Sequence, residues 1–79
     1  MIINHPNKTH ESSANLAEMT RQGAVSAAVA AGGGSAAVAA AVKTAEVAYY
    51  RAVIASCVAN GVEAGGFRQG LHDLIGVYA

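Results

Sequence analysis

The sequence predicts an all-α protein, a helical hairpin or small bundle around a long alanine-rich central helix, which assembles as an oligomer. Hydrophobic residues recur at spacings of three and four along most of the chain, the period of one helix face. The only proline is Pro6, and glycine-containing turns divide the rest. Much of the 53% hydrophobic fraction is alanine, which buries little apolar area per residue. A 79-residue chain with so few large side chains gains stability from partner subunits.

Residues 1–11 are polar and show no helical period, so we expect a flexible arm there. The single helical domain then spans 12–79. Ser12 and Ser13 can cap a first helix over about 14–31 by accepting hydrogen bonds from its free amides.

One face of this first helix begins with large side chains and becomes small toward its end. Its members are Leu16, Met19, Gly23, Ser26 and Ala30. Glu18 and Arg21, three residues apart, are expected to form a solvent-exposed pair.

Three consecutive glycines, Gly32 to Gly34, predict a break, because each costs about 1 kcal/mol relative to alanine inside a helix. Ser35 is placed to cap the next helix. The alternative is one continuous helix from Ala14 to Asn60, held through the glycines by neighbouring chains.

The second helix is expected over 36–59, with two apolar stripes that indicate cover on more than one side. Asn60-Gly61-Val62 then places a glycine where a left-handed residue ends a helix, followed by a hydrophobic residue. A third helix over about 66–76 carries apolar residues at helical spacing. We expect it to fold back on the second helix as an αα-hairpin.

Charge and cysteine content argue against several classes of function. Five basic residues balance five acidic ones, so the basic patch typical of nucleic-acid binding is missing and no such partner is expected. Cys57 is the only cysteine, which rules out an internal disulfide and fits a cytoplasmic or virion-associated protein. The first residues lack the pattern of a signal peptide.

Three patterns suggest sites, and each has a simpler interpretation. The glycine run could hold an anion at a helix start, but it lacks a P-loop lysine. The uncharged stretch from Gln22 to Val42 has the length of a membrane span, yet it lacks leucine, isoleucine and phenylalanine. Cys57, His72 and Asp73 resemble a catalytic set, but Cys57 lies on an apolar helix side. We therefore predict no catalytic residue, no cofactor and no metal site.

Adjacent Tyr49 and Tyr50 point about 100° apart on a helix, so both rings are covered only if partners lie on two sides. Tyrosine and arginine also dominate binding hot spots. The alternative is that Tyr49 is core and Tyr50 lies flat on the surface. The predicted protein interface consists of Tyr49, Tyr50, Arg51, Ile54, Phe67 and Leu71.

The run from Ala45 to Ala55, then Asn60-Gly61-Val62 and the run from Phe67 to Leu74, resembles short helical proteins of phage and prophage gene clusters. The resemblance implies accessory structural proteins or small inhibitors of host proteins, with no catalytic residues. We predict a non-enzymatic protein-binding or assembly module, a homo-oligomer and possible phage structural component. The alternatives are a small inhibitor that docks on a host complex, and a membrane-active, pore-forming segment.

Overall fold

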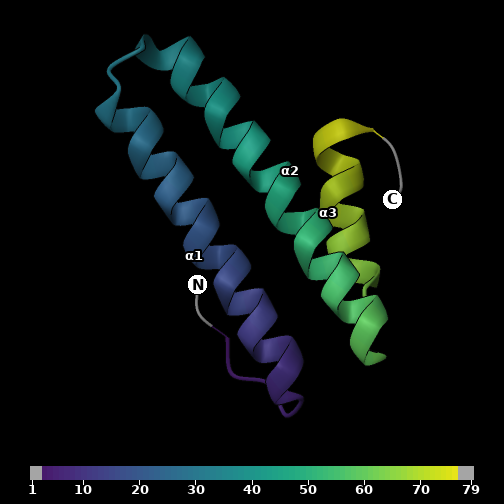
Figure 1. The fold of residues 1–79 in the computed structure, drawn as a ribbon. Coiled ribbons are helices and arrows are strands. Elements are labelled where there is room, and N and C mark those ends of the chain that lie inside the picture. The colour runs from purple at the N-terminus through teal and green to yellow at the C-terminus, as the bar shows by residue number, and fades with distance from the viewer. Residues whose placement is uncertain (1–2, 77–79) are drawn as a thin grey trace.

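The structure is a computed structural model that describes residues 3–76 (Figure 1). In this part of the chain the helices are α1 (Lys8–Ala30), α2 (Gly34–Asn60) and α3 (Gly65–Ile75). α1 and α2 run side by side in opposite directions, and the shorter α3 packs back on α2. α1 and α3 do not pack against each other. The predicted all-α class is confirmed.

We call the turn between α1 and α2 the tip of the hairpin, and the opposite end, where α1 begins and α2 ends, the base. The turn occupies residues 31–33, with left-handed backbone at Gly32 (φ 68°) and Gly34 (φ 85°). The predicted break is confirmed, and the alternative of one continuous helix is wrong. Ser35 lies inside α2 and does not cap it, because the capping position is Gly33, which has no side chain to donate or accept.

The first helix begins at Lys8 rather than at Ala14, so the prediction of a flexible arm over residues 1–11 is wrong for its last residues. Asn7 is the cap, and its Oδ1 accepts a hydrogen bond from the amide of His10 at 3.0 Å. Lys8 pairs with Glu11 at 2.9 Å across the first turn. These polar residues carry no hydrophobic period, which is why the pattern placed the helix start too late.

The residues before the cap also fold back along α1. The amide of Ile3 donates to Asn15 Oδ1 at 2.8 Å, and Asn15 Nδ2 donates to the Ile3 carbonyl at 3.2 Å. Ile3 packs against the buried core as well. The segment expected to be a flexible arm is therefore held against α1 from residue 3 onward, by hydrogen bonds between the Ile3 backbone and the Asn15 side chain.

The predicted turn between the second and third helices is confirmed in detail. Gly61 is left-handed, with φ 66° and ψ 28°. The amide of Val62 donates to the Cys57 carbonyl at 2.9 Å, the long bond of a Schellman cap. Val62 is half-buried against the core, so the hydrophobic contact of that cap is also present.

The buried core lies at the base of the hairpin. Ala14, Val53, Cys57 and Ala64 form one cluster, and Phe67 packs against it. Val53 is fully buried, which contributes about 1.5–3 kcal/mol. Toward the tip, most side chains of both helices are alanines and stay exposed.

The face of α1 that begins with large side chains and becomes small is not the face that packs on α2. The buried residues are His10, Ala14 and Glu18, whereas Leu16 and Met19 are 65% and 60% exposed. The spacing of apolar residues points to the stripe that contains Leu16 and Met19. The structure instead buries the neighbouring stripe, because its polar side chains, His10 and Glu18, have hydrogen-bond partners.

Candidate functional site

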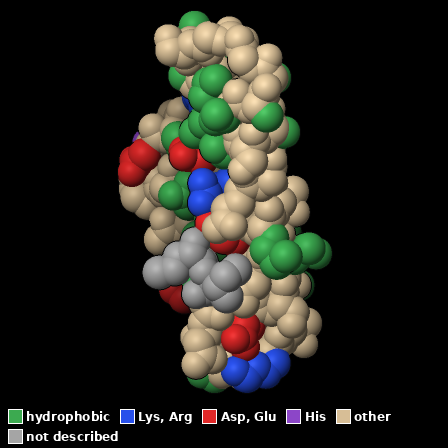
Figure 2. Space-filling model, turned by 90° about the vertical axis from the view of Figure 1, so that its left-hand side faces the viewer, with side chains coloured by type: hydrophobic (Ala, Val, Ile, Leu, Met, Phe, Trp, Pro, Cys, Tyr) green, Lys and Arg blue, Asp and Glu red, His purple; other side chains and the backbone are tan. Residues whose placement is uncertain are grey.

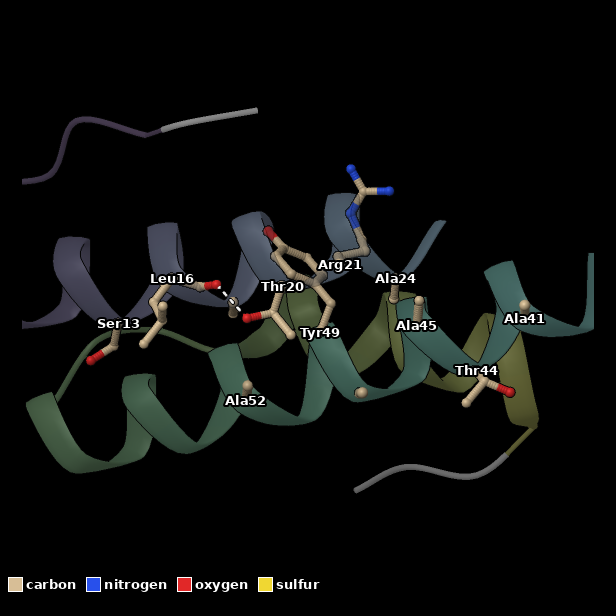
Figure 3. Close-up of a pocket in the computed structure, with 12 residues that line it drawn as sticks. Ser13, Leu16, Thr20, Arg21, Ala24, Ala41, Thr44, Ala45, Tyr49 and Ala52 are labelled. Atoms are coloured by element: carbon tan, nitrogen blue, oxygen red, sulfur yellow. Dashed lines mark hydrogen bonds between the residues drawn. The ribbon is translucent and has the colours of Figure 1, made fainter. Parts of the chain in front are cut away.

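An open groove of about 750 Å³ runs between α1 and α2 (Figure 3). Each helix contributes residues spaced mostly three and four apart, which is one helix face. The lining residues are Ser13, Leu16, Ala17, Thr20, Arg21, Ala24, Ala41, Thr44, Ala45, Ala48, Tyr49 and Ala52. We take this groove as the candidate site, because both long helices contribute to its lining.

Small side chains give the groove an apolar character. Half of the twelve lining residues are alanines, and the two threonines donate their hydroxyl protons within their own helices. Thr20 Oγ1 donates to the Leu16 carbonyl at 2.9 Å, and Thr44 Oγ1 donates to the Ala40 carbonyl at 3.0 Å. The groove therefore presents mainly methyl groups, with few hydrogen-bond donors available to a ligand.

Arg21 is the only charged lining residue, and it is already paired. Its Nε donates to Glu18 Oε2 at 2.9 Å and its Nη2 to Glu18 Oε1 at 2.5 Å, while Gln22 Nε2 donates to the same carboxylate at 3.0 Å. The Glu18 side chain is only 4% exposed, so the prediction of a solvent-exposed pair is wrong. The guanidinium holds the pKa of the Glu18 carboxyl far below its usual range, and Glu18 raises the pKa of Arg21.

Tyr49 connects this ion pair to the groove. The Arg21 guanidinium carbon lies 5.9 Å from the centre of the Tyr49 ring, a cation–π distance. Burial raises the pKa of the Tyr49 hydroxyl, so the ring stays neutral. Since Arg21 and Glu18 neutralise each other, the groove carries no net charge. Of the six residues predicted to form an interface, Tyr49 alone lines it.

The other five predicted interface residues lie elsewhere. Ile54 on α2 and Leu71 on α3 are buried, at 8% and 0% exposure. Tyr50 and Phe67 are half-buried and contact each other, with ring centres 6.4 Å apart. Arg51 is exposed. Most of this apolar surface is therefore used inside the chain, and a role in contacts between chains stays a prediction.

The sequence did not predict the groove, because most of its lining residues are small and carry no charged or reactive group. Ala17, Thr20 and Ala24 repeat at three and four on α1, and Ala41, Ala45 and Ala48 repeat likewise on α2. Small residues at this spacing let two helices approach closely. This spacing of small residues could have indicated the groove, but only once it is known which two helices lie side by side.

Leu16 forms part of the groove edge at its base end and is 65% exposed. Figure 2 views the molecule from the α1 side. It shows hydrophobic side chains and backbone near the tip, with most of the charged side chains below. Leu16 is continuous with the small side chains that line the groove, and it is contiguous apolar surface of this kind that marks contact sites.

A buried polar cluster joins the helices at the base. His10 Nδ1 lies 2.9 Å from Ser56 Oγ, and Asn60 Nδ2 donates to the Ser56 carbonyl at 2.8 Å. The His5 ring packs edge-on against His10, with centres 5.0 Å apart. His10 is 2% exposed, so the cluster satisfies buried polar groups between α1 and α2 and leaves a substrate no access to this histidine.

Other candidate sites lack suitable chemistry. Burial raises the pKa of the Cys57 thiol, the opposite of what a nucleophile requires. Asp73 accepts a hydrogen bond from Gln69 Nε2 at 2.8 Å, one turn away on the same helix. Within residues 3–76, no three His, Cys, Asp or Glu side chains lie close enough together to hold a metal ion.

The uncharged stretch from Gln22 to Val42 is divided between α1 and α2. No helix in the described part of the chain combines the length and apolar character needed to cross a membrane. Comparison with protein-family models, curated proteins and solved structures finds no match.

Proposed function

We propose that this protein is a non-enzymatic assembly module whose α1/α2 groove binds a second copy of the same chain. The observation that carries the proposal is the groove itself, whose one charged lining residue is paired with Glu18 and which is otherwise lined mainly by small side chains and bordered by an exposed leucine. Such a surface suits close helix packing and offers little to a charged or strongly polar ligand.

The dimensions of the molecule support a partner of this kind. It measures 40 × 25 × 15 Å along its principal axes. A stable interface buries about 800 Å² on each partner, which the broad side of a molecule of this size can supply. A second copy would also cover the alanine surface that the chain leaves exposed toward its tip.

Electrostatics favour a copy of the chain over an oppositely charged partner. The protein has no net charge, and the one charged lining residue is neutralised by Glu18. Two identical grooves therefore face each other without like-charge repulsion, which would otherwise disfavour a two-fold contact.

Sedimentation of two matched variants tests the proposal. Ala24 lines the groove and is exposed, whereas Ala39 is exposed and does not line it. Ala24→Glu buries an unpaired carboxylate in each copy at the interface. We expect it to weaken self-association at least about 100-fold, equivalent to about 2.7 kcal/mol. Ala39→Glu adds the same charge and should leave association near that of the parent chain.

Two results would contradict the proposal. One is a folded single chain at every concentration, which would favour the alternative of docking on a different protein. The other is an equal effect of both substitutions, which would mean that charge rather than the groove controls association. The predicted phage origin stays a prediction.

A further inference from the structure

Side-chain size differs between the two ends of the groove, while the large side chains of Arg21 and Tyr49 lie between these ends. Leu16 stands at the base end, next to Ser13 and Ala17, and is 65% exposed. The tip end is lined by Ala24, Ala41 and Thr44, none of which extends beyond a short side chain. Figure 3 shows this arrangement, with Leu16 and Ala41 at opposite ends of the groove.

This gradient distinguishes two ways of placing two grooves face to face. With both tips pointing the same way, both copies of Leu16 would gather at one end, and methyl groups would face methyl groups at the other. With the tips opposed, each Leu16 would lie over the partner's end lined by Ala24 and Ala41. Protein interfaces pack to nearly crystalline density when large side chains face small ones.

We infer that two copies pair groove to groove about a two-fold axis, with their tips pointing in opposite directions. This inference rests on the proposed function and names the arrangement of the two chains. The two α1 helices then cross antiparallel near the middle of the groove, as do the two α2 helices. The α1/α2 layer of one copy therefore packs on the α1/α2 layer of the other. The axis passes near Thr20, which lies midway along the α1 lining.

The arrangement fixes a distance between the tips. Ser35 is exposed near the tip, roughly 12 residues from the middle of the α2 lining, or about 18 Å at 1.5 Å per residue. Opposed tips therefore separate the two copies of Ser35 by about 36 Å. Tips pointing the same way would place them at the same height on packed helices 8–10 Å apart, less than about 20 Å from each other.

Pulsed electron–electron double resonance on the spin-labelled Ser35→Cys variant measures this distance in the full chain. Cys57 is buried, and the parent chain treated with the same label controls for its reaction. We expect a distance near 36 Å. A mass above one chain with a distance below about 20 Å would overturn the arrangement but leave the assembly function intact. A mass of one chain would overturn both.

Disulfide formation gives a second, independent measurement. Thr20→Cys places the new thiols of the two copies beside the axis, so mild oxidation should convert most of the protein to a covalent dimer. The substitution removes the Thr20 hydroxyl, whose hydrogen bond goes to the Leu16 carbonyl within α1 and not to another helix. Ala39→Cys, exposed and outside the groove, should yield little covalent dimer. Equal yields from the two variants would contradict the position of the axis.

Discussion

Two glycines are expected to respond in opposite directions to the same substitution. Gly61 is left-handed, with φ 66°, and an added Cβ would meet no atom within 4 Å. Gly61→Ala therefore costs only backbone strain, about 1–2 kcal/mol. Gly23 lies inside α1 with ordinary helical backbone, and its Cβ would also meet nothing within 4 Å. Gly23→Ala should stabilise the protein by about 0.8–1 kcal/mol.

Urea denaturation of both variants, at one protein concentration because association adds to apparent stability, measures the difference. We expect the two free energies of unfolding to differ by about 2–3 kcal/mol. Each kcal/mol corresponds to roughly 4–8 °C in Tm for a chain of this size. A Gly61→Ala variant within about 0.5 kcal/mol of the parent chain would refute the Schellman cap. Destabilisation by Gly23→Ala would show that another chain approaches α1 closely at that point.

Two further predictions concern contacts between and within the helices. A Cβ at Gly70 would lie 2.8 Å from the Tyr50 ring, so Gly70→Ala should lower the free energy of unfolding by about 1–3 kcal/mol. In a chain that also carries Tyr50→Ala, the same glycine substitution should cost little. Additive effects of the two substitutions would contradict this contact. Because Arg21 lowers the pKa of the Glu18 carboxyl below its ordinary value of 4.5, stability should be full above about pH 4.5 and decline as the pH falls toward the lowered pKa. Glu18→Gln should flatten that decline in acid titrations followed by circular dichroism, and an unchanged slope would argue against the buried pair.

Several features of the chain follow from local sequence. The break at Gly32 to Gly34 and the cap at Gly61 were predictable because a left-handed backbone is strained for any residue with a Cβ. The order of the three helices and the hairpin of the last two follow from those positions. The start of α1 was misplaced because Asn7 and Ser12 are both suitable caps, and the polar residues between them give no period with which to choose.

Other features depend on which side chains meet across helices. Leu16 and Met19 form the more apolar stripe of α1, yet the structure leaves them exposed and buries Glu18. Burying a carboxylate is unfavourable unless it is paired and hydrogen-bonded, and Arg21 and Gln22 meet both conditions here. The groove has the same origin, because alanines become a surface only when two helices lie side by side. The sequence by itself determined where the helices break and turn, since those are local backbone preferences. The tertiary structure decided which faces are buried and which remain open, because the free energy of burial depends on partners distant in the chain.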